Sequence, residues 1–148
     1  MSGRPEAMVA LHVVVGIMVI ASNLVAGGWG GIAWLRHQPS VGFWYALRFA
    51  QAAVVLQVGL GAILLLSGRE GNGLHYLYGV LPIVVSLLAE AARAGAAERE
   101  LTGLDFESLP KDRQRLTALA IVRRETGIMA VSALVIFLLA LRAATTTG

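Results

Sequence analysis

Residues 74–90 read LHYLYGVLPIVVSLLAE, an apolar run that opens with a histidine. An earlier apolar run opens in the same way, with LHVVVG beginning at Leu11. In both runs a glycine follows the histidine four residues later: these pairs are His12 with Gly16 and His75 with Gly79. Residues four apart lie on one face of a helix. The pattern therefore predicts two apolar helices that each present a histidine and a glycine on the same face.

The composition is that of a membrane protein. Of the 148 residues, 57% are hydrophobic and 14% are charged, whereas soluble domains contain about 25% charged residues. The net charge is only +3, and no basic stripe is interleaved with aromatic residues, so we expect no nucleic-acid partner. The absence of cysteine excludes disulfide exchange, iron–sulfur clusters and covalently attached c-type heme.

Four segments are long and apolar enough to cross a bilayer, which takes about 20 residues. We place these spans at about residues 7–35, 41–67, 74–92 and 122–142. A tight polar turn at residues 68–73 makes the second and third spans antiparallel neighbours. The sequence predicts an all-α integral membrane protein, built as one up-down-up-down four-helix bundle in the lipid bilayer.

Residues 93–121 form the one long polar connection and carry charges of both signs. Pro110 and Lys111 have the pattern of a helix start, and apolar residues follow with helical spacing. We therefore expect an amphipathic surface helix that leads into the last span. At the other end of the chain, residues 1–6 are expected to form a short polar tail.

Glycine and tryptophan are concentrated at the end of the first span, where residues 27–35 read GGWGGIAWL. The tryptophans suit the membrane–water boundary. The glycines are equally consistent with close helix contact, as small residues are in lipid.

Basic residues gather on one side of the predicted bundle. Nine flank the first and third connections, and three lie on the opposite side: Arg36, Arg48, Arg93, Arg99, Lys111, Arg113, Arg115, Arg123 and Arg124, against Arg4, Arg69 and Arg142. The positive-inside rule then places both connections in the cytoplasm and both termini outside the cell membrane.

The histidines are the candidate metal ligands. In an up-down-up-down bundle the first and third spans are parallel and lie diagonally, so His12 and His75 share one depth, about one turn below the outer surface. Low-spin heme b takes two neutral imidazoles on opposite faces of its ring. We therefore predict that His12 and His75 bind one heme b near the outer face.

Four glycines and one arginine complete the predicted site. Gly16 and Gly79 would leave room for the edge of the macrocycle, and Gly59 and Gly61 would relieve crowding from the second span. Arg69 is a candidate partner for a heme propionate. The plainer alternatives are that each histidine is interfacial or hydrogen-bonded between helices, and that Arg69 is a solvated turn charge.

Residues 57–66 read QVGLGAILLL and precede a short turn and Leu74-His75. This arrangement resembles the Q-x-x-L-G helix and the histidine-led helix of heme A synthases, over about residues 7–92. Each four-helix half of that family holds a pair of histidines toward the outer face, so the resemblance implies heme binding by His12 and His75. The chain lacks a carboxylate placed as in the family's catalytic extracellular loop, and the resemblance does not extend to heme hydroxylation.

These observations favour a b-type membrane cytochrome that exchanges electrons with a quinol or a redox partner protein. An electron-transfer or accessory role is more consistent with the sequence than a stand-alone enzyme. The alternative is a cofactor-free membrane subunit or assembly factor that docks partners through residues 93–121. The sequence leaves homo-oligomerisation open.

Overall fold

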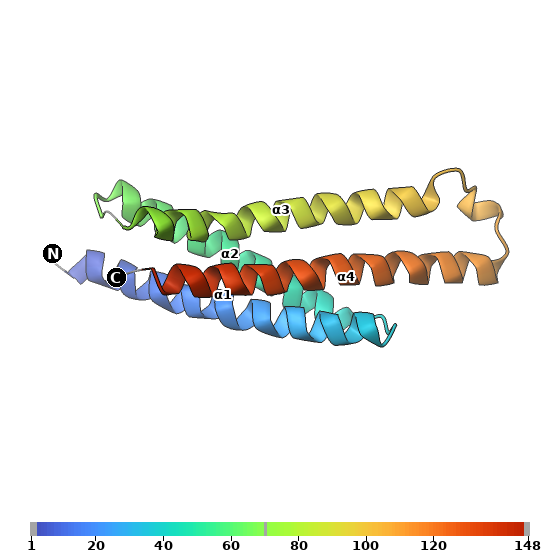
Figure 1. Ribbon diagram of the computed structural model, residues 1–148, viewed down its shortest axis with the longest axis horizontal. Coiled ribbons are helices and arrows are strands. Elements are labelled where there is room, and N and C mark those ends of the chain that lie inside the picture. Colours follow the sequence, from blue (N-terminus) through green and yellow to red (C-terminus); the bar gives the residue numbers. More distant parts are fainter. Residues whose placement is uncertain (1–2, 70, 147–148) are drawn as a thin grey trace.

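The computed structural model describes residues 3–69 and 71–146, which are almost entirely helical. The elements are α1 (Gly3–Leu35), α2 (Val41–Leu66), α3 (Gly73–Leu101), the short 3-10 helix η1 (Phe106–Ser108) and α4 (Lys111–Ala144). The four α-helices are each long and apolar enough to cross a membrane, and they pack as a bundle (Figure 1). The predicted all-α membrane bundle is thereby confirmed.

Some predictions fall on residues outside this description. They are Met1 and Ser2 of the predicted N-terminal tail and Glu70 of the predicted 68–73 turn. The remainder of the predicted tail, from Gly3 onward, belongs to α1.

The helices alternate in direction, so the start of α1, the end of α2, the start of α3 and the end of α4 lie at one end of the bundle (Figure 1). We call it the histidine end, because His12 and His75 lie there. The opposite end holds the α1–α2 turn and the α3–α4 connection. We call it the arginine end, after Arg48, Arg93 and Arg124.

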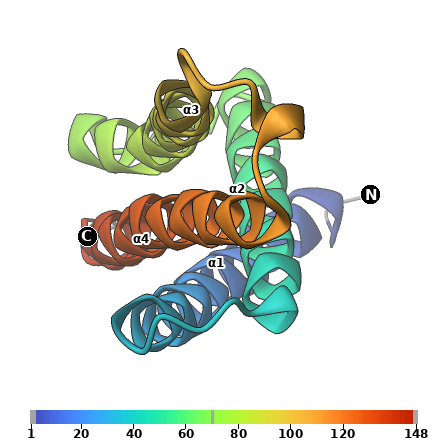
Figure 2. The same cartoon turned by 90° about the vertical axis from the view of Figure 1, so that its right-hand side faces the viewer.

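α4 is the central helix, because it packs along both α1 and α3. Figure 2 looks toward the arginine end and shows α4 between α1 and α3, with α2 to one side. α2 packs mainly on α1 and contacts α3 much less, although a short turn joins α2 to α3. α1 and α3 are therefore diagonal, as predicted. The second and third spans, α2 and α3, were predicted to be neighbours, and they contact each other only loosely.

Small residues produce the tightest contacts, in the half of the bundle nearer the arginine end. A Cβ atom added at Gly30 of α1 would overlap the ring of Phe43 and the methyl group of Ala130. Phe43 and Met129 are completely buried. The glycines of the GGWGG stretch thus include a close-contact position, which is how small residues let helices approach in lipid.

The predicted 93–121 connection is much shorter in the structure. α3 continues to Leu101, and the predicted surface helix is the first part of α4, so only residues 102–110 connect the two helices. Residues 93–101 are nearly all alanine, glutamate, arginine or leucine, which are strong helix formers. Their polarity marked the end of the membrane-embedded part of the helix and not the end of the helix itself. α3 and α4 thus form a hairpin that projects beyond the α1–α2 turn (Figure 1).

Candidate functional site

A cavity of about 700 Å³ lies at the histidine end, with all four α-helices and the 67–72 turn contributing to its wall. Ligand sites in proteins usually measure about 300–1,000 Å³. Six of the predicted site residues line it, namely His12, Gly16, Gly61, Arg69, His75 and Gly79. Gly59 lies on the exposed surface of α2 and is not part of the wall. The fold therefore gathers residues from α1, α2 and α3 that the sequence could only relate by spacing.

The rings of the two histidines lie close together in the wall of this cavity. Their ring centroids are 6.0 Å apart, and their ring planes are inclined at 62°. A bond between a metal and an imidazole nitrogen measures about 2 Å, so two imidazoles on opposite sides of one ion have centroids about 6 Å apart. The observed separation of His12 and His75 agrees with that value.

His75 is held by a main-chain acceptor on another helix. Its Nδ1 lies 3.1 Å from the carbonyl oxygen of Ala143, in the last turn of α4. Because a carbonyl oxygen only accepts, Nδ1 carries the proton and donates it. The lone pair of Nε2 is then free. A backbone acceptor on one ring nitrogen is the usual support of a metal-ligating histidine, since it sets the tautomer and orients the ring.

His12 is held by a side chain from α2. Its Nε2 lies 3.2 Å from Nε2 of Gln57. The other ring nitrogen, Nδ1, is buried and has no hydrogen-bond partner among the residues that the structure describes, and the same is true of Oε1 of Gln57. An unpaired buried polar group costs roughly 1–3 kcal/mol. His12 therefore lines the cavity with one ring nitrogen held by Gln57 and the other buried and unpaired.

The tautomer of His12 depends on the orientation of the Gln57 amide, whose oxygen and nitrogen can exchange places by a half-turn. With the amide oxygen toward His12, Nε2 donates and Nδ1 retains a free lone pair. With the amide nitrogen toward His12, Nε2 accepts and Nδ1 carries the proton. In the first orientation each histidine has one nitrogen held by the protein and one lone pair free.

The glycines have two different surroundings. A Cβ at Gly61 would lie 3.3 Å from Cε1 of His12, and one at Gly16 would lie 3.1 Å from Nε2 of Gln57. These two positions leave room for the His12 and Gln57 side chains. A Cβ at Gly79 would meet no atom within 4 Å, and Gly79 lines the cavity. Gly79 is therefore the glycine that faces open cavity space.

Two partners of the histidines were outside the predicted site. Gln57 begins the QVGLGAILLL stretch quoted from the sequence, and in the structure its side chain contacts His12 and so joins α1 and α2. No sequence pattern could single out the carbonyl group of Ala143, because every residue has a backbone carbonyl. Only the proximity of the end of α4 to the start of α3 identifies it.

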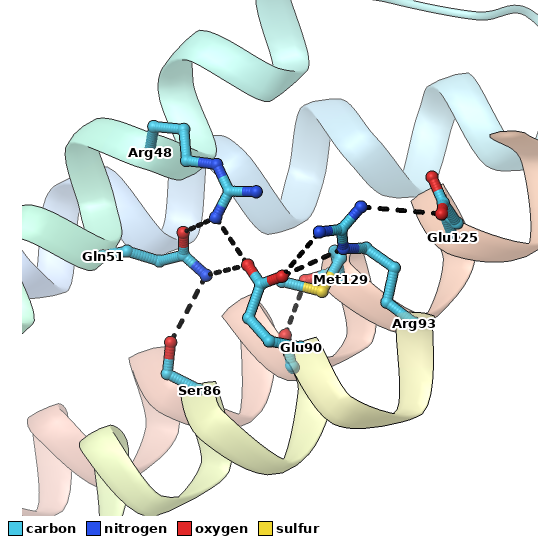
Figure 3. Close-up of polar contacts among 8 residues, drawn as sticks. Arg48, Gln51, Ser86, Glu90, Arg93, Glu125 and Met129 are labelled. Atoms are coloured by element: carbon cyan, nitrogen blue, oxygen red, sulfur yellow. Dashed lines mark hydrogen bonds and ion pairs between the residues drawn. The ribbon is translucent and has the colours of Figure 1, made fainter. Parts of the chain in front are cut away.

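A separate polar cluster joins α2, α3 and α4 nearer the arginine end (Figure 3). We call it the Glu90 cluster; it consists of Arg48, Gln51, Ser86, Glu90, Arg93 and Glu125. Oε1 of Glu90 accepts hydrogen bonds from Arg48 at 2.5 Å and from Gln51 at 2.9 Å.

The second carboxylate oxygen of Glu90 is held from its own helix. Oε2 accepts from Nε of Arg93 at 2.9 Å, and Arg93 also lies 3.5 Å from Glu125 of α4. Two positive and two negative side chains balance in the Glu90 cluster, and Glu90 is bonded through both oxygens. We therefore assign the cluster a structural role, which is to hold α2 and α4 against α3.

In comparisons with known proteins, no family model matches this chain, no curated protein matches its sequence and no solved structure matches its fold. The function is therefore inferred from the geometry of the site.

Proposed function

We propose that His12 and His75 bind one heme b as its two axial ligands, and that the protein transfers electrons. The observation that carries this proposal is the 6.0 Å separation of the two imidazoles inside a cavity of about 700 Å³. Among the described residues, no group of three or more His, Cys, Asp or Glu side chains is placed to hold a metal ion. Heme iron needs only two protein ligands, because the macrocycle supplies the other four.

The wall of the cavity suits an amphipathic macrocycle. Most of it is aliphatic, as with Ile20 and Val54, and Gly79 leaves open space beside His75. Arg69 lines the cavity at the 67–72 turn, where its guanidinium can pair with a propionate. When bound, heme supplies one-electron chemistry, and the protein tunes its potential through axial ligation, hydrogen bonding and burial.

The distribution of basic residues supports a site near the outer face. Nine lysine and arginine residues lie near the arginine end and three near the histidine end, as counted above. By the positive-inside rule, the arginine end is cytoplasmic and the histidine end faces outward. Electrons would then be exchanged with a quinol or a partner protein at the outer half of the membrane.

The test is an absorption spectrum of the purified protein from heme-sufficient cells, first oxidised and then reduced with dithionite. We expect a Soret band and split visible bands for the wild type and for His37→Ala, since His37 lies in the exposed α1–α2 turn. His12→Ala and His75→Ala should each lose the six-coordinate spectrum. Circular dichroism of all four proteins checks that the helices form.

A wild-type protein that remains colourless after incubation with excess hemin would exclude the heme proposal. In that case the cofactor-free subunit or assembly factor becomes the better reading, with the α3–α4 hairpin as its docking element. If His12→Ala and His75→Ala both kept the wild-type spectrum, these histidines would be excluded as ligands. Heme would then be bound by other residues.

A further inference from the structure

A second cavity, of about 670 Å³, lies near the arginine end, where α4 passes between α1 and α3. Its wall includes Trp34 of α1, Glu100 of α3, and Arg123, Arg124 and Gly127 of α4. It shares no residue with the histidine cavity or with the Glu90 cluster. This cavity therefore requires its own explanation.

Hydrogen-bond donors exceed acceptors in this wall. Arg124 is paired with Glu100 at 2.8 Å, but more than half of its side chain stays exposed. Arg123 is exposed and has no ion pair or hydrogen bond within residues 3–69 and 71–146. Within the same residues, the indole N–H of Trp34 has no acceptor; it lies over Gly127, where an added Cβ would come within 2.8 Å of Nε1. The site offers two guanidinium groups and an indole N–H against one carboxylate.

The position of this cavity matches the headgroup level of a bilayer. Trp34 lies in the last turn of α1, and tryptophan is enriched at the membrane–water boundary. Arg123 and Arg124 lie where the apolar part of α4 begins. From there Ile128 and Val131 continue the wall toward the middle of the membrane. The wall is cationic at one side and apolar at the other, as a phospholipid is anionic at its head and apolar along its chains.

We infer that this cavity binds the headgroup phosphate of an anionic phospholipid. The phosphate oxygens accept hydrogen bonds from Arg123, Arg124 and Nε1 of Trp34, and an acyl chain lies along Ile128 and Val131. The planar fork of arginine matches phosphate geometry. Basic pockets between membrane helices are known to bind such headgroups. The inference uses no part of the heme proposal, so the two are tested separately.

The experiment compares lipid retention by the full chain in nanodiscs or by native mass spectrometry. Phosphatidylglycerol is compared with phosphatidylcholine for the wild type, Arg123→Gln and the double variant Arg123→Gln/Arg124→Gln. The matched control is Arg113→Gln/Arg115→Gln, because these two exposed residues lie on the same helix outside the cavity. Both double variants remove the same charge. Arg123→Gln breaks no ion pair, so it keeps the test valid if loss of the Arg124–Glu100 pair disturbs folding.

We expect the wild type and the control to prefer phosphatidylglycerol. Arg123→Gln should weaken the preference roughly fivefold and the cavity double variant more than tenfold, since each basic side chain near an anionic surface contributes roughly fivefold. Equal losses in both double variants would overturn the inference, because they would indicate a diffuse charge effect. No preference in the wild type would overturn it too. Displacement of the lipid by millimolar inorganic phosphate would show that the site takes free phosphate instead.

Discussion

Nδ1 of His75, near the start of α3, lies 3.1 Å from the carbonyl oxygen of Ala143, near the end of α4. This contact joins two helices whose sequence separation is 68 residues. It also specifies which nitrogen of His75 carries the proton, because the carbonyl can only accept.

The first prediction concerns that proton. In the heme-free protein, ¹⁵N-histidine spectra should show His75 as the Nδ1–H tautomer at neutral pH. His37, which lies in an exposed turn, should show the usual exchange between tautomers and serves as the internal comparison. An Nε2–H signal for His75 would mean that the Ala143 bond does not form in solution.

The second prediction concerns Gly79, and it compares the stability of the heme-free protein with the uptake of heme. Gly79→Ala should leave the thermal stability of the heme-free protein unchanged or slightly raised, because its Cβ meets nothing within 4 Å and alanine favours the helix. It should weaken heme uptake about tenfold, since overpacking a filled site costs roughly 1–3 kcal/mol. Gly59→Ala, on the exposed face of α2, should have the same small effect on stability and leave heme uptake unchanged. Hemin titrations would argue against heme beside Gly79 if both variants behaved alike.

The third prediction concerns close packing in the GGWGG stretch. Gly30→Ala should lower the free energy of unfolding by roughly 1–3 kcal/mol, because its Cβ overlaps Phe43 and Ala130. Gly31→Ala, one position later, meets nothing within 4 Å and should be neutral or stabilising by up to about 1 kcal/mol, through helix propensity. Unfolding with SDS in mixed micelles measures both. Equal effects would mean that α1 does not pack in this register.

The fourth prediction concerns the Glu90 cluster. Glu90→Gln should destabilise the bundle by roughly 1–3 kcal/mol, because it removes the carboxylate that Arg48 and Arg93 share. The control is Glu98→Gln, at an exposed position of the same helix, and it should change stability by less than about 0.5 kcal/mol. In the Glu90→Gln background, Arg48→Gln should cost little more. Additive losses would show that the two side chains are not coupled.

The fifth prediction concerns orientation in the membrane. The chain contains no cysteine, so a single introduced cysteine can be labelled without background. Ser67→Cys, in the α2–α3 turn, should react with a membrane-impermeant maleimide in intact cells, whereas Ser108→Cys, in the α3–α4 connection, should react only after lysis. The reverse result would invert the proposed topology and move the histidine site to the cytoplasmic half.

Much of this architecture follows from local sequence patterns. Four apolar runs with short turns determine the alternating helices. The repeated LHxxxG spacing singled out His12 and His75, whose ring centroids lie 6.0 Å apart in the structure. Close helix contact was one of two interpretations of the glycine-rich stretch. Only the packed structure shows that Gly30 makes this contact, because its neighbour Phe43 belongs to another helix.

Other features depend on tertiary structure that a single sequence does not encode locally. Hydropathy measures where a helix leaves the lipid, so it could not locate the end of α3, whose polar last turns remain helical. The carbonyl of Ala143 and the unpaired Nδ1 of His12 depend on how α4 and α2 approach the histidines. The looseness between α2 and α3 likewise results from packing and not from either helix's composition.

The central position of α4 determines how the molecule can be built. Helices emerge from the ribosome in chain order, and N-terminal parts associate first. α1 and α2 can pair early, but α3 has few contacts with α2 and is secured only when α4 inserts between α1 and α3. That step also brings the Ala143 carbonyl to His75. The wall of the histidine cavity is therefore complete only after α4 has inserted, because Ala140 and Ala143 of α4 form part of it.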